Sequence, residues 1–169
     1  MKRLLIMLLI CVPVAVMADG RKVKKANAET EAWRYEIEPV STGTQGSVVL
    51  KVWSYSKKSE IAAEQSKKNA VHGVIFKGFP AKDRVTGRKP LVAESAEAEN
   101  AEFFDNFFGE GGDYMRFVAL TNSGALGGGD VMKTTKKEYK VGVTVTVSYN
   151  DLRSYLEEKG IVKKLGGGF

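Results

Sequence analysis

Apolar and polar residues alternate without interruption over residues 139–148, and this segment constrains the fold more than any other part of the chain. Its apolar members are one tyrosine and four valines: Tyr139, Val141, Val143, Val145 and Val147. Successive side chains of a β-strand point to opposite faces, and valine is common in strands. The segment therefore predicts a strand with one face against a hydrophobic core and the other in water. Such a strand needs both a sheet and a covering layer.

Three other segments predict strands of the same sheet: residues 32–38, 47–55 and 114–120. In the first of these, Trp33, Tyr35 and Ile37 share one side and charged residues occupy the other. The second is apolar on both faces, which favours a central position. Residues 39–46 lie between these two strands and are rich in Ser, Thr and Gly, as in the connection of a hairpin.

Helical periodicity predicts three helices. They are expected from Ser56 or Ser59 to about Lys77, over 97–109, and over 150–160 with Asn150 as the N-cap. One stripe of the first helix is rich in small residues, which let a helix backbone lie close to a sheet: Ala62, Ser66, Ala70 and Gly73 or Val74.

These elements give the order β-β-α-α-β-β-α. The sequence therefore predicts an α+β fold, with an antiparallel sheet of about four strands and helices packed mainly on one face. We expect one domain over residues 32–169. Residues 19–31 are charged and rich in alanine without apolar periodicity, so a flexible leader is expected there.

The start of the chain has the three parts of a signal peptide. Met1, Lys2 and Arg3 form a basic region, an apolar run follows over residues 4–16, and small side chains precede Asp19. The run is shorter than the roughly 20 apolar residues that cross a bilayer. We therefore expect cleavage after Ala18, no integral membrane span in the mature chain, and a periplasmic or secreted location.

The only cysteine, Cys11, lies inside this segment. Ile10 stands before it, where a lipoprotein cleavage site has a small residue, so we do not expect a lipid anchor. Residues 19–169 contain no cysteine, which excludes disulfides, thiol nucleophiles and cysteine metal sites from the mature chain.

Residues for catalysis are sparse. His72 is the only histidine and no Ser-His-Asp pattern accompanies it, so we interpret it as a packing residue. With one histidine, a metal site would depend on carboxylates, and no acidic motif has ligand spacing. The acidic residues that begin the second predicted helix are interpreted as its solvated face: Glu94, Glu97, Glu99, Glu102 and Asp105. No cofactor is predicted.

The formal net charge of +6 includes Lys2 and Arg3 of the signal peptide, and the remaining lysines are scattered in pairs. This mild surplus does not predict nucleic-acid binding.

Four phenylalanines form a stripe wider than a single packing seam needs: Phe103, Phe104, Phe107 and Phe108. Two interpretations stay open, a core helix and a docking surface for a partner. A second kind of site is also open, a small-molecule or glycan binder or hydrolase. It would use the loops at 79–95 and 121–130, with Trp33 or Trp53 as a stacking platform.

The stretch over residues 51–78 combines a strand with an alanine-rich helix of the form Ala-x-x-Gln-x-x-x-x-Ala, and a late Tyr-x-Val-x-Val-x-Val strand leads into another helix. In this it resembles a group of uncharacterised secreted proteins of Bacteroidetes-type bacteria. More distantly it resembles small envelope lipoprotein and flagellar-assembly domains. The resemblance implies a non-enzymatic interaction or assembly module with a protein partner in the cell envelope. The sequence leaves the oligomeric state open.

We predict that Asp19 is the first residue of the mature protein, because Val16 and Ala18 supply the small side chains that signal peptidase reads. Intact-mass spectrometry of exported protein should give the mass of residues 19–169. The Ala18→Tyr variant should keep its leader and accumulate uncleaved. Exported wild-type protein that retains Met1 would contradict the prediction.

Overall fold

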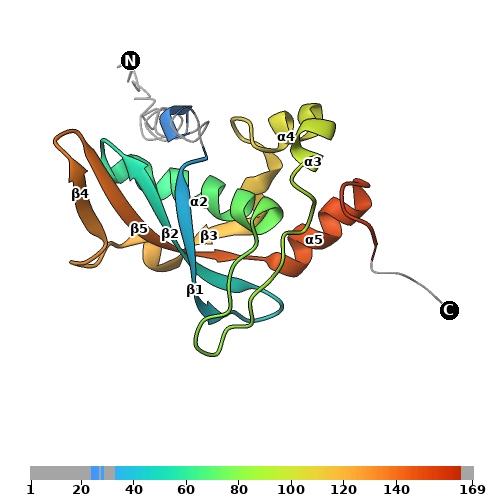
Figure 1. Ribbon diagram of the computed structural model, residues 1–169, viewed down its shortest axis with the longest axis horizontal. Coiled ribbons are helices and arrows are strands. Elements are labelled where there is room, and N and C mark those ends of the chain that lie inside the picture. The colour runs from blue at the N-terminus through green and yellow to red at the C-terminus, as the bar shows by residue number, and fades with distance from the viewer. Residues whose placement is uncertain (1–23, 27, 29–32, 165–169) are drawn as a thin grey trace, which may run out of the picture.

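The computed structural model describes residues 24–26, 28 and 33–164, and the predicted signal peptide and most of the predicted leader lie outside them. The fold is α+β, with one antiparallel sheet, as the sequence predicts (Figure 1). The strands are β1 (Tyr35–Thr42), β2 (Val48–Ser56), β3 (Val118–Leu120), β4 (Val131–Thr135) and β5 (Glu138–Val147). The helices are α2 (Ser59–Phe76), α3 (Ala96–Glu99), α4 (Ala101–Phe107) and α5 (Tyr149–Glu158), with the 3₁₀ turns η1 (Asp113–Phe117) and η2 (Thr121–Gly124).

Strand β5 is the central strand of the sheet. The order is β1-β2-β5-β3, and β4 also pairs with β5. On one edge of β5, its first residues pair with β4 and its last three residues pair with β3. Strand β2 pairs with β5 along the opposite edge. The valines of the alternating segment are buried from Val141 to Val147, and the register places Leu50 opposite Val145 and Val52 opposite Val143. Alternation in the sequence has therefore identified the strand on which the sheet is built.

Helix α2 covers the inner face of the sheet, and its small-residue stripe is buried. Ala62, Ser66 and Ala70 are fully buried. A Cβ atom added to Gly73 would lie 1.9 Å from Cδ1 of Ile37, so this glycine permits a close approach between α2 and β1. Figure 1 shows α3 and α4 on the same side of the sheet as α2, with α5 at one end.

Several predicted elements differ from the observed ones. Residues 114–117 form the 3₁₀ turn η1 and only Val118–Leu120 forms a strand. The reason is burial of both Tyr114 and Phe117, since residues three apart share one side of a 3₁₀ turn but not of a strand. The predicted helix over 97–109 is interrupted at Asn100, whose φ of −124° and ψ of 37° are not helical.

Two further boundaries are corrected by the structure. Ser148, not Asn150, is the N-cap of α5, and no side-chain hydrogen bond caps this helix. The side chain of Asn150 lies against Gly46 instead. Strand β4 was not predicted because all its side chains are exposed, so its sequence has no apolar alternation. Strand β1 continues to Thr42, through residues predicted as a loop.

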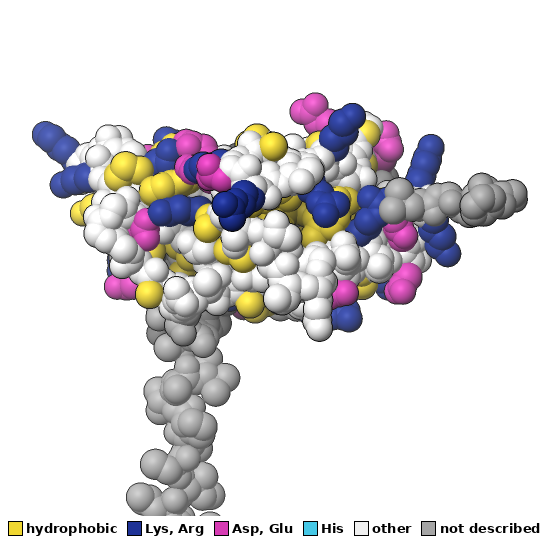
Figure 2. Space-filling model, turned by 90° about the horizontal axis from the view of Figure 1, so that it is seen from below, with side chains coloured by type: hydrophobic (Ala, Val, Ile, Leu, Met, Phe, Trp, Pro, Cys, Tyr) yellow, Lys and Arg dark blue, Asp and Glu magenta, His cyan; other side chains and the backbone are white. Residues whose placement is uncertain are grey.

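The outer face of the sheet carries Trp53 among paired charges. Its indole N–H donates to Glu38 at 2.7 Å, and its ring lies over Gly142, where a Cβ atom would be 2.7 Å away. Ion pairs surround it: Lys140 with Glu36, Lys82 with Glu38, and Lys51 with Asp130. Seen from below, the molecule displays basic side chains close to acidic and apolar ones (Figure 2).

We predict that Ala70→Leu lowers the free energy of unfolding by about 1–3 kcal/mol or more, because the larger side chain separates α2 from the sheet. Glu60→Leu is the matched control, since Glu60 is exposed in the first turn of the same helix. Its effect should stay within about 0.5 kcal/mol. Urea denaturation followed by circular dichroism measures both, and equal effects would contradict close packing at Ala70.

Candidate functional site

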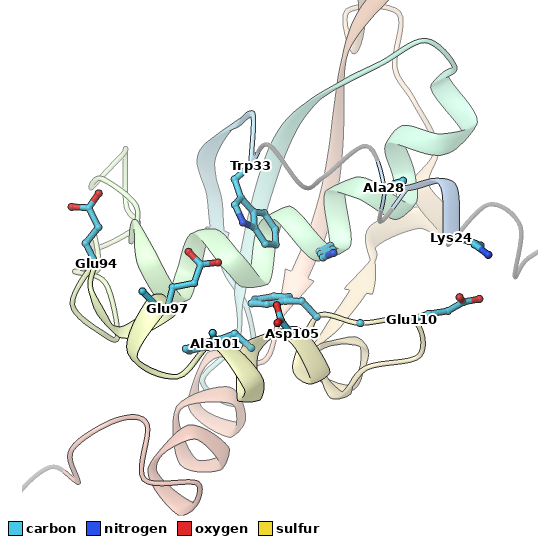
Figure 3. Close-up of a pocket in the computed structure, with 13 residues that line it drawn as sticks. Lys24, Ala28, Trp33, Glu94, Glu97, Ala101, Asp105 and Glu110 are labelled. Atoms are coloured by element: carbon cyan, nitrogen blue, oxygen red, sulfur yellow. The ribbon is translucent and has the colours of Figure 1, made fainter.

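A cleft of about 750 Å³ lies between α2 and the α3–α4 segment, close to the point where the leader enters β1. We call it the Trp33 cleft and define it by Trp33, Lys68, Glu97, Phe104, Asp105 and Phe108, which line it. In Figure 3, Trp33 reaches from the start of β1 toward α2, and Glu97 points up toward the indole from α3. Glu94 and Glu110 project outward at opposite ends of the cleft.

Trp33 forms an aromatic wall of the cleft. Its backbone has a φ of 45°, in the left-handed region that non-glycine residues seldom adopt, and the chain turns there into β1. The indole stacks on the imidazole of His72 with ring centroids 3.5 Å apart, and it meets the ring of Phe108 edge-on at 5.3 Å. The ammonium group of Lys68 lies 5.3 Å from the centroid of the indole. The indole of Trp33 therefore already makes a cation–π contact with a lysine of the protein.

His72 is buried behind Trp33 in a fixed tautomer. Its Nδ1 lies 2.5 Å from the hydroxyl of Tyr35. Burial, and then the charge of Glu97, raise the pKa of Tyr35 above its usual range, so the phenol keeps its proton and donates it to Nδ1. The proton of the neutral imidazole is therefore on Nε2. That atom is buried without a hydrogen-bond partner and lies 3.5 Å from Oε1 of Glu97.

His72 is not suited to acid–base catalysis at neutral pH. Burial, followed by the charges of Lys77 and Lys68, lowers the pKa of His72 to about 3. Its one acceptor nitrogen is already used by Tyr35. A general base needs a pKa near the working pH and a free lone pair. The structure thus places His72 in the packing around Trp33, which agrees with the interpretation of its sequence context.

Glu97 differs from the solvated carboxylate that the sequence predicts. Its side chain is 40 % exposed and belongs to the wall of the cleft. Burial raises the pKa of the Glu97 carboxyl, a hydrogen bond with the Trp33 indole opposes the rise, and the negative charge of Asp105 adds to it. Glu99 and Glu102, by contrast, are exposed as predicted.

Among the described residues that line the cleft, acidic residues outnumber basic ones. Glu94, Glu97, Asp105 and Glu110 line it together with two lysines, Lys24 and Lys68. Residues 91–112, which supply all four carboxylates, contain no Lys or Arg. The cleft therefore favours a positively charged group over an anion.

The four phenylalanines are mostly core residues. Phe104, Phe107 and Phe108 are buried, and only Phe103 is partly exposed. Phe103 lines a smaller hollow of about 370 Å³ next to Tyr155, whose hydroxyl donates to Asp113 at 2.6 Å. A docking role stays a prediction, and the exposed surface for it is limited to Phe103.

The second predicted site is brought together only in part. Of the two loops at 79–95 and 121–130, the first contributes Glu94 to the Trp33 cleft, and no described residue of the second lines it. Trp53 lies on the outer face of the sheet, with the ammonium groups of Lys51 and Lys140 4.8 and 5.3 Å from its ring centroid. Trp33 is thus the tryptophan that borders a cavity.

The described residues contain no group of three or more His, Cys, Asp or Glu side chains that could hold a metal ion. Within the same residues, none of the helices combines the length and apolar character needed to cross a membrane. Comparison with protein-family models, curated proteins and solved structures gave no match for this chain.

We predict that the single histidine stays uncharged over the physiological range. The C2 proton of His72 should show no NMR titration between pH 5 and pH 8, because the pKa is lowered to about 3. A midpoint near the ordinary value of 6.5 would contradict its burial between Trp33 and Tyr35.

The same shift predicts that stability falls on acidification. The unfolded chain takes up a proton on His72 below pH 6.5 and the folded chain does not, so folding stability is complete above pH 6.5 and is lost as the pH falls. Between pH 6.5 and pH 5 the free energy of unfolding should decrease by up to about 1.4 kcal/mol per pH unit. Urea denaturation of wild type and of His72→Phe measures this, and the decrease over this range should be smaller in the variant.

Proposed function

We propose that the protein is an exported, non-enzymatic binding module of the cell envelope, and that the Trp33 cleft holds an amine-bearing ligand. The observation that carries the proposal is the cleft itself, with an aromatic wall and four carboxylates around about 750 Å³. Carboxylates attract an ammonium group, and an indole face binds one by cation–π attraction.

A binding role fits the chemistry better than hydrolysis does. The only histidine is neutral and engaged by Tyr35, so it cannot activate a nucleophile or water. The raised pKa of Glu97 favours an incoming cation, because a cation beside the carboxylate replaces the solvation that burial removes. A glycan binder that stacks a sugar on Trp33 is the alternative, supported by the partly exposed indole.

We also propose that the ligand belongs to a protein partner in the periplasm or outside the cell, and that the chain is related to the secreted Bacteroidetes-type proteins. The export signal over residues 1–18 supports the location. Strand β2 followed by the alanine-rich α2 supports the relationship.

The chain has two tryptophans, so Trp53→Phe leaves Trp33 as the only indole reporter. We predict that tetralysine changes the fluorescence of residues 19–169 carrying Trp53→Phe in a saturable way. Adding Glu97→Gln and Asp105→Asn should weaken binding at least about tenfold, because two carboxylates of the cleft lose their charge. Glu138→Gln removes a carboxylate outside the cleft and should leave the affinity unchanged.

The neutral sugar maltotriose tests the alternative with the same reporter. No response to tetralysine, or equal affinities of the wild-type and the doubly neutralised cleft, would overturn the proposed ligand class. A response to maltotriose alone would establish the glycan binder in its place.

A further inference from the structure

The four carboxylates of the Trp33 cleft come from one continuous segment of the chain. Glu94 precedes α3, Glu97 belongs to α3, Asp105 belongs to α4, and Glu110 follows α4. Figure 3 shows Glu94 and Glu110 at opposite ends of the cleft, with Glu97 and Asp105 between them. No three of the described acidic or histidine side chains are placed to hold one metal ion, so these carboxylates do not converge on a point. Negative charge is spread along the length of the cleft instead.

His72 provides an independent indication that the middle of the cleft takes a cation. Its Nε2 is buried, has no hydrogen-bond partner, and lies 3.5 Å from Oε1 of Glu97. A buried donor without an acceptor is costly. Burial and the charge of Asp105 raise the pKa of the Glu97 carboxyl, which favours its protonated form. A cation beside Glu97 keeps the carboxyl ionised, so that both of its oxygens can accept from the N–H of His72.

Two further carboxylates of the same segment lie outside the cleft. Glu99 is in α3 and Glu102 is in α4, both are exposed, and neither lines the cleft. Glu94 and Glu110, at the ends of the cleft, are exposed as well. The two pairs therefore carry the same charge in the same exposure class and differ in position. A comparison between them separates an effect of the cleft from an effect of the total charge of the segment.

We infer that the ligand is an extended, lysine-rich segment of the protein partner, which lies lengthwise in the cleft with ammonium groups at Glu94, Glu97 and Glu110. The inference rests on the proposed function and names the chemistry of the partner and the direction in which it binds. A compact ligand with a single ammonium group reaches only the middle of this row of carboxylates. A chain with several ammonium groups also reaches the ends, and each later contact forms at a high effective concentration once the first is made.

The first test compares two double variants of the mature Trp53→Phe protein, with tetralysine as the probe and indole fluorescence as the signal. Glu94→Gln with Glu110→Gln should weaken binding at least about threefold, because two exposed ion pairs with the probe are lost. Glu99→Gln with Glu102→Gln removes the same charge from the same segment and should bind as the parent does. Equal affinities of the two double variants would overturn the inference, because the total charge of the segment would then explain any change.

The second test shortens the probe to N-acetyl-lysine amide, which has a single ammonium group. It should bind the Trp53→Phe protein at least about tenfold more weakly than tetralysine does, because it makes one ion pair instead of several. The variant with Glu94→Gln and Glu110→Gln should bind this short probe as the parent does. Equal affinities for the two probes, or an equal loss of affinity for both in this variant, would overturn the inference while the proposed function stands. Absence of tetralysine binding to every variant overturns both.

Discussion

The close approach of α2 to the sheet is the constraint on which the rest of the structure depends. Ala62, Ser66 and Ala70 are fully buried at this contact, and the missing side chain of Gly73 makes room for Ile37 of β1. A hydrophobic layer forms only where backbone and side chains fill the space without voids. Because α2 lies so near β1, His72, which directly precedes Gly73, reaches the hydroxyl of Tyr35, and Trp33 can stack on the imidazole.

A directed chain of hydrogen bonds fixes α2 in that position. The amide of Asn69 donates to Ser54 at 2.9 Å, Ser54 and Ser66 are 3.2 Å apart, and Ser66 donates to the carbonyl of Ala62 at 2.6 Å. Because Ser66 donates its hydroxyl proton to the carbonyl of Ala62, Ser54 is the donor in the hydrogen bond between the two serine hydroxyls. Buried polar groups that find partners in only one arrangement select that arrangement. Together with small residues on one stripe, they set both the distance and the rotation of the helix.

The sequence predicts what depends on periodicity and misses what depends on tertiary contact. Alternation in β5 and the small-residue stripe of α2 are local patterns, and both were identified correctly. The 3₁₀ turn at Tyr114 depends on the burial of Tyr114 and Phe117 in the core, and the fully exposed β4 has no pattern to detect. In the site, Trp33 was identified by residue type. The contacts of His72 with Tyr35 and Glu97 join residues far apart in sequence, and no local spacing indicates them.

The pKa values of carboxyl groups are shifted in opposite directions on the outer face of the sheet and in the Trp33 cleft. On the outer face, hydrogen bonds with Lys140 and Lys82 lower the pKa values of Glu36 and Glu38. These charges already have partners and gain little from a ligand. Among described carboxyls with a shifted pKa, only that of Glu97 is raised, by burial and by Asp105. A cation at Glu97 lowers that pKa again, so its binding favours loss of a proton from the cleft.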